Sequence, residues 1–202
     1  MSTPDSPRSS ERNGREEPNA LLPLESAADV GRSNYARVEF DQHISEMLTE
    51  HARQRSPENC SDRSYRNHLL GVASEVAVAT WQDGVIDIEI YPDYCGDDGV
   101  DVVAPAKWGN GTDTFQVKAT RKMRSPEQWV APDELDKADY FVLCATNAPS
   151  RYVEIVGYIP QRILRNVGTG YLENGYLLSA EYLNPVKPTH YSPSDVRDVM
   201  YS

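Results

Sequence analysis

Residues 100–119, which read VDVVAPAKWGNGTDTFQVKA, contain two apolar segments separated by a short loop. The side chains of the segments at residues 100–104 and 112–119 have the alternating polarity of strands. The glycines and asparagine of PAKWGNG suit a hairpin-like connection between them. We therefore predict that the two segments are neighbouring strands of one sheet.

Three polar side chains of this strand pair are predicted to face the same way. Successive side chains of a strand point to opposite faces, so Gln116 and Lys118 share one face while Phe115 and Val117 occupy the other. Asp101 lies fifteen residues before Gln116, between two valines that would point away from the face it occupies. If the strands pair through the short loop, a carboxylate, a carboxamide oxygen and an ammonium converge on one surface.

Oxygen ligands of this kind indicate a site for a hard cation. Mg²⁺ keeps several waters and takes only one or two carboxylates from a protein. The metal would activate water and stabilise charge on a phosphoryl oxygen, while Lys118 would orient that water or neutralise the developing anion. We therefore predict Mg²⁺ or Mn²⁺ as the cofactor, beside Asp101 and Gln116.

The strongest helical signal of the chain lies at residues 64–82. Its apolar positions recur with a period of about 3.6 residues, and Ser61 or Asp62 can cap its first turn. Further apolar residues predict a helix that is buried on most sides. Glu75 is an acidic residue within the apolar sequence GVASEVAVAT, and we interpret it as a further carboxylate that points along the edge of the sheet.

The remaining pattern predicts an α/β or α+β fold around a mixed sheet. Residues 1–33 are poor in apolar side chains and are predicted to form a flexible tail, which leaves residues 34–202 as one domain. Further helices are expected at residues 35–52 and 160–167 and as a capped turn near Ser192 and Asp195, and further strands at residues 85–90, 140–145 and 152–159.

Composition excludes several classes of protein. The 202 residues contain no run of about 18 apolar residues and no secretory signal, so we expect a cytoplasmic protein without a membrane partner. Its three cysteines lack the spacing of a zinc or redox site. The net charge of -11 comes with only five lysines, a composition typical of proteins that work in concentrated salt. There the Debye length falls to about 3 Å, so the overall charge does not exclude a nucleic-acid partner.

Together these motifs resemble the PD-(D/E)XK nuclease superfamily, which has the restriction-endonuclease-like fold. The resemblance rests on a G-x-x-x-E helix at Gly71–Glu75, a DGVD segment that ends at Asp101, and the Q-x-K strand, and it covers roughly residues 64–160. It implies an α/β fold with a central mixed sheet flanked by helices, and the activity of a Mg²⁺-dependent endodeoxyribonuclease.

The resemblance also implies a role for each candidate side chain. Asp101 would be the metal-binding aspartate, Lys118 the catalytic lysine and Glu75 the helix carboxylate. Gln116 would occupy the slot of the second acidic residue. A valine replaces the proline of the family's Pro-Asp dipeptide, and the glutamine removes one negative charge from the metal site. Metal binding would then be weaker, or would depend more on Glu75 and Asp98.

A basic stretch follows the Q-x-K motif directly. Arg121, Lys122 and Arg124 lie within seven residues of Lys118, and Arg66, at the start of the predicted helix, can add to them. Local positive charge of this kind suits a phosphate backbone, so DNA is the predicted partner. Cleavage of both strands with one site per chain would favour a homodimer.

Two other functions compete with the nuclease as interpretations of this sequence. In the first, Gln116 marks lost metal binding, and a nuclease-like fold binds nucleic acid or protein without cleaving it. The second, a small-molecule hydrolase, is disfavoured because the sequence has neither a serine elbow nor a cysteine with a partner histidine at an interpretable spacing.

Overall fold

The computed structural model describes residues 26–30, 34–54, 65–86, 100–107, 110–167 and 175–200. The helices are α1 (Ala27–Val30), α2 (Gln42–Gln54), α3 (Tyr65–Gln82), α4 (Gln161–Val167), α5 (Pro193–Met200) and the 3-10 turn η2 (Ala180–Tyr182). The strands are β1 (Ala36–Glu39), β2 (Val85–Ile86), β3 (Val102–Pro105), β4 (Thr112–Thr120), β5 (Glu127–Val130), β6 (Tyr140–Ala145), β7 (Tyr152–Pro160), β8 (Tyr176–Ser179), β9 (Asn184–Pro185) and β10 (His190–Tyr191).

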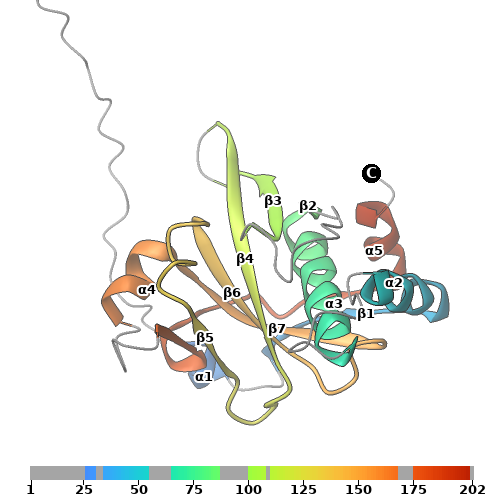
Figure 1. Ribbon diagram of the computed structural model, residues 1–202, viewed down its shortest axis with the longest axis horizontal. Coiled ribbons are helices and arrows are strands. Elements are labelled where there is room, and N and C mark those ends of the chain that lie inside the picture. Colours follow the sequence, from blue (N-terminus) through green and yellow to red (C-terminus); the bar gives the residue numbers. More distant parts are fainter. Residues whose placement is uncertain are drawn as a thin grey trace, which may run out of the picture.

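A curled, mixed sheet organises the described residues, with its strands in the order β10-β1-β7-β6-β4-β3-β2 and β9 paired to β7 (Figure 1). β2, β3 and β4 are successive antiparallel neighbours, whereas β4 and β6 run parallel. β7 returns antiparallel to β6. Helices flank this sheet, so the α/β class and the mixed sheet predicted from the sequence are confirmed.

One face of the sheet, called here the helical face, is covered by α2, α3 and α5. Figure 1 shows α3 between the long strand β4 and the pair α2 and α5. Side chains from these helices and from the sheet form one hydrophobic core, which includes Leu48, Val76, Val196, Val102, Phe115 and Val142. Burial of this apolar surface is the main force that holds the helices on the sheet.

The opposite face, called here the ribbon face, is covered by α4 and by a two-stranded ribbon in which β5 pairs with β8. Its separate core includes Val130, Leu178, Leu164, Phe141 and Leu143. The sequence did not predict this ribbon. β5 has only four residues, and its partner strand begins almost fifty residues later.

The predicted helix at residues 64–82 is confirmed as α3, and most of its residues are buried. Small side chains such as Ala73, Ala77 and Ala79 are completely buried and let its neighbours approach closely. The hydroxyls of Ser74 and Thr80 donate to the carbonyls four residues earlier, each at 2.8 Å. These bonds let polar side chains remain in an apolar helix.

The predicted hairpin is also confirmed. β3 and β4 pair antiparallel, with Val102 opposite Phe115 and Pro105 opposite Thr112. The strand expected at residues 85–90 is described only over Val85–Ile86, and its remaining residues lie outside the described part of the chain.

The single helix predicted at residues 35–52 is wrong. Its first part is strand β1, which alternates between buried and partly exposed side chains and pairs with β7. Asp41 then separates strand from helix, because its Oδ1 accepts the N–H of Ile44 at 3.0 Å and so caps α2. The apparent helical spacing of apolar residues across this region combines the two-residue period of β1 with the 3.6-residue period of α2.

Ala27–Val30, which the sequence assigns to the flexible tail, form α1. The N–H of Ala27 donates to the carbonyl of Leu183 at 2.9 Å, and the Ala27 side chain is buried. The rest of the predicted tail, residues 1–25 and 31–33, lies outside the described residues. None of the helices that the structure describes combines the length and apolarity needed to cross a bilayer.

Candidate active site

β4 carries Gln116 and Lys118 on the ribbon face of the sheet. Phe115 and Val117 pack with the core of the helical face, so the alternation of the strand directs Gln116 and Lys118 to the opposite side. In the parallel pairing with β6, their partners are residues of the ribbon-face core. The structure therefore places the two polar side chains of the Q-x-K motif on one surface.

Asp101 reaches the same segment of β4 through hydrogen bonds. Its backbone N–H donates to the carbonyl of Phe115 at 3.0 Å, and its Oδ2 accepts the N–H of Val117 at 2.5 Å. Val117 lies between Gln116 and Lys118, so the carboxylate rests against the middle of the motif. Asp101 is only 6% exposed, and a hydrogen bond in such a poorly hydrated position is electrostatically strong.

Gln116 is the most buried polar residue of this group, with 3% of its surface exposed. Within the described part of the chain, its Oε1 has no hydrogen-bond partner. A buried oxygen in this condition costs about 1–3 kcal/mol of desolvation free energy. Such an oxygen indicates either strain or a place for an ion or water.

Lys118 makes an ion pair that the sequence did not indicate. Its Nζ donates to Oε1 of Glu134 at 2.8 Å, and the two side chains are 16% and 25% exposed. Glu134 lies in the turn-rich connection between β5 and β6. A lysine placed on a buried strand face requires an anionic partner. This requirement could have indicated from the sequence that Lys118 has an acidic partner. It does not identify which acidic residue of the connection that partner is.

Glu75 lies on α3, which covers the helical face. It is 7% exposed, and its Oε1 lies 3.6 Å from the position that a Cβ on Gly71 would take. A Cβ at Gly71 would therefore meet this carboxylate at ordinary van der Waals distance. Glu75 lies on a helix of the helical face, whereas Gln116 and Lys118 project from the ribbon face. The convergence of Glu75 with them therefore stays a prediction. Asp98 lies outside the described residues.

Arg121 joins the loop after β4 to the first turn of α3. Its guanidinium donates to Oδ1 of Asn67 at 2.9 Å and to the carbonyl of Arg66 at 2.5 Å. The structure thus brings the backbone of Arg66 beside Arg121. That the two side chains belong to one basic surface stays a prediction. A strand rises by about 3.3 Å per residue, so Arg121 begins about 10 Å beyond Lys118.

The other two basic residues of this loop differ in their electrostatic surroundings. Lys122 and Arg124 are both exposed. The Nζ of Lys122 contacts Oε1 of Glu127 at 2.5 Å, so part of its charge is already compensated. Arg121, Lys122 and Arg124 are called the basic loop below.

Asp101 and Gln116 offer the oxygen ligands that Mg²⁺ requires. A carboxylate offers about four lone-pair sites, so the bond to Val117 does not exhaust Asp101. The unpartnered carbonyl oxygen of Gln116 supplies a neutral oxygen ligand on the adjoining strand. No group of three or more His, Cys, Asp and Glu side chains within the described ranges could hold a metal ion. The expected ligands Asp101, Gln116 and Glu75 include only two carboxylates, as Mg²⁺ commonly uses.

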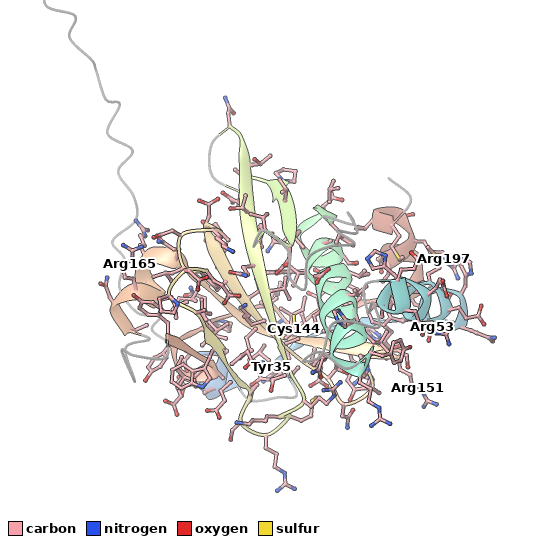
Figure 2. The ribbon with its side chains drawn as sticks, in the orientation of Figure 1. Tyr35, Arg53, Cys144, Arg151, Arg165 and Arg197 are labelled. Atoms are coloured by element: carbon pink, nitrogen blue, oxygen red, sulfur yellow. The ribbon has the colours of Figure 1, made fainter. Side chains whose placement is uncertain are left out.

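Cys144 offers no alternative chemistry. It lies on β6, where Figure 2 labels it, and it is completely buried. Burial raises the pKa of its thiol far above the ordinary range, and a hydrogen bond with Ser74 only partly opposes that effect. A thiol that cannot ionise is a poor nucleophile, so a cysteine hydrolase does not fit this position.

Comparison of the chain with family models, with curated proteins and with solved structures finds no match. The function must therefore be inferred from the arrangement of these side chains.

Proposed function

We propose that this protein is a metal-dependent nuclease that hydrolyses phosphodiester bonds of DNA. One observation carries the proposal. The buried carboxylate of Asp101 is bonded to the amide of Val117, between a glutamine whose carbonyl oxygen has no partner in the described structure and a lysine on the same strand face. The group combines oxygen ligands with a cation in a small, poorly hydrated space.

Each residue of the group has a distinct proposed role. Asp101 and Gln116 hold the metal, and Glu75 contributes from α3. When bound, Mg²⁺ supplies activation of water and neutralisation of charge on the phosphoryl group. The ammonium group of Lys118 donates a hydrogen bond where negative charge develops on the phosphate. The basic loop binds the DNA backbone outside the buried group.

We also propose that the sheet is of the restriction-endonuclease-like type. Support comes from the order of the elements that carry the site. The glutamate helix α3 is followed by β2, then by β3, which begins directly after Asp101, and then by β4 with Gln116 and Lys118. β3 and β4 are immediate neighbours in the sheet. This is the order and the type of elements that the resemblance implies.

Incubation with plasmid DNA in high salt tests the proposal, with Mg²⁺ or Mn²⁺ and then with excess chelator. We expect cleavage that requires the metal and is abolished in Lys118→Met and Asp101→Asn. Lys137→Met is the matched control, because Lys137 is an exposed lysine of the connection that carries Glu134. Thermal unfolding of each variant shows whether its fold persists. Cleavage that survives in a folded Lys118→Met would contradict the proposed site.

A second candidate, a nuclease-like protein that binds without cleaving, is favoured by one observation. Gln116 replaces the expected acid, so the metal site has lost a negative charge. This candidate predicts intact plasmid under every ionic condition while the protein still shifts DNA in a binding assay. The plasmid experiment therefore separates the two functions.

A further inference from the structure

The ion pair between Lys118 and Glu134 is part of a fixed arrangement. Both oxygens of the Glu134 carboxylate are engaged. Oε1 receives the Lys118 ammonium at 2.8 Å, and Oε2 accepts the N–H of Ala131 at 2.9 Å. The backbone N–H of Glu134 also donates to the carbonyl of Ala131 at 3.0 Å. Glu134 thus closes its own turn while it holds the lysine.

The connection around Glu134 is fastened on both sides. Leu135 is buried in the ribbon-face core. Asp136 accepts a hydrogen bond from Gln161 at 2.8 Å and pairs with Arg165, which Figure 2 labels on α4. The Glu134 carboxylate is therefore the fixed partner of the pair, and it restrains the flexible side chain of Lys118.

Further along the connection, Asp139 bonds to β4 itself. Its Oδ2 accepts the N–H of Thr114 at 3.0 Å and the Thr114 hydroxyl at 2.7 Å. The connection is therefore tied to the same strand that carries Lys118. This contact anchors the end of the connection to β4 independently of the ion pair.

We propose that Glu134 is the positioning residue of Lys118, an inference that rests on the proposed nuclease function. A lysine has a flexible four-carbon stem and many rotamers, so an unheld ammonium would sample many positions. Gln116, the neighbour of Lys118 on the same face, is neutral and cannot supply an electrostatic partner. Glu134 supplies it from the adjoining connection and holds the ammonium in place before DNA arrives.

The alternative use of Glu134 is as a metal ligand. That use would place a divalent cation beside the carboxylate that now pairs with Lys118, and the two positive charges would repel each other. The release of Oε1 would free the Lys118 ammonium, so metal binding and the exposure of Lys118 would rise together. A ligand role therefore predicts that metal raises the accessibility of Lys118, whereas a positioning role predicts no such rise.

Acetylation of lysines by an N-hydroxysuccinimide ester measures that accessibility without any need for activity. Peptide mass spectrometry follows the modification of Lys118, with exposed Lys187 as an internal reference. We expect Glu134→Gln, which keeps the size and the Ala131 contact but loses the charge, to raise the rate at Lys118 about fivefold. Glu134→Asp should give a smaller increase. Asp133→Asn, a matched loss of charge on the same turn, should leave the rate unchanged.

Two results of the labelling experiment would overturn the inference. The first is an unchanged rate at Lys118 in folded Glu134→Gln. The second is a rise in the wild-type protein to the Glu134→Gln rate when Mg²⁺ is added, since that result would assign Glu134 to the metal. Thermal unfolding of both Glu134 variants shows whether the fold is retained.

Cleavage kinetics then connect the position of Lys118 to the reaction. Glu134→Gln should lower kcat about tenfold or more while KM for DNA changes by less than about twofold, and Glu134→Asp should recover part of the loss. An effect of Glu134→Gln on KM alone would contradict a positioning role. If the wild type cleaves no DNA, the proposed function fails, while the labelling still decides whether Glu134 holds Lys118.

Discussion

The carboxylate of Asp101 accepts the backbone N–H of Val117, and through this bond a residue next to β3 is joined to the centre of the Q-x-K motif on β4. The same carboxylate is the proposed metal ligand. Asp101 therefore has a structural role that does not depend on metal, and variants at this position must separate the two roles.

Two substitutions at Asp101 are expected to differ in stability but not in metal binding. Asp101→Ala leaves the N–H of Val117 without its acceptor in a buried place, which should lower the free energy of unfolding by about 1–3 kcal/mol. Asp101→Asn can keep an acceptor oxygen and should lose less. Both variants lose the charge and should lose Mn²⁺ binding. Urea unfolding and Mn²⁺ titration measure the two effects, and equal stability of the two variants would argue against the bond.

Gln116→Glu is expected to increase the dependence of the protein's stability on metal. Without metal, the new buried charge should lower the free energy of unfolding by about 1–3 kcal/mol. With Mn²⁺ at about one hundred times its dissociation constant, binding should return about 2.7 kcal/mol. Thermal unfolding with Mn²⁺ and with chelator measures this difference.

Gln116→Met is the matched control for that experiment. It keeps a similar side-chain length but removes the oxygen that lacks a partner in the described structure. Its stability should equal or exceed that of the wild type without metal, and Mn²⁺ should have no effect on it. A fall in stability of Gln116→Met would show that the amide makes an essential interaction and that its oxygen is not held ready for a ligand.

The sequence was sufficient for features that depend on short-range periodicity. The common face of Gln116 and Lys118 follows from the two-residue period of a strand, and the nearness of Asp101 follows from the short connection to β4. Glu134 could not be found in this way. It lies sixteen residues beyond Lys118 in a turn-rich segment, and only the parallel pairing of β4 with β6 brings that segment back to the lysine.

The prediction around Asp41 failed for a related reason. Apolar residues before and after Asp41 fit one helical spacing, although β1 pairs with β7 and only α2 is helical. Strand pairing between distant segments overrides a local helical pattern, and the sequence of the local window contains no record of that partner. The capping side chain at Asp41 was the local signal of the boundary.

Asp41 should also make the stability of the helical face depend on pH. The N–H of Ile44 and, to a smaller degree, the positive charge of Arg197 hold the pKa of its carboxyl below the ordinary value. A lowered carboxyl pKa in the folded state means that the stabilisation is present above the ordinary pKa and is lost as the pH falls through the lowered one.

Asp41→Asn should therefore reduce the urea midpoint most at neutral pH. The difference between this variant and the wild type should shrink as the pH falls from neutral to below the ordinary carboxyl pKa of about 3.9, because the native carboxyl is protonated only below that value. Asp133→Asn, at an exposed position, is the control. A difference that stays constant over this range would show that the Asp41 charge does not contribute.

The basic loop leads to a prediction about salt. Each phosphate contact that is lost reduces the slope of log K against log salt by about 0.9 for duplex DNA. Arg124→Ala should weaken binding and reduce the slope by one such step. Glu127→Gln should strengthen binding, because Lys122 would lose the carboxylate that now compensates its charge. Fluorescence anisotropy with labelled DNA in chelator measures both slopes without cleavage.

Arg53→Ala provides the comparison for charge alone. Arg53 lies on α2 and pairs with Glu50, so its removal changes the net charge of the protein by the same amount at a different surface (Figure 2). If DNA binds at the basic loop, Arg53→Ala should keep the wild-type slope while Arg124→Ala loses part of it. Equal losses in the two variants would mean that DNA responds only to the net charge of the chain, and the basic loop would then have no special part in binding.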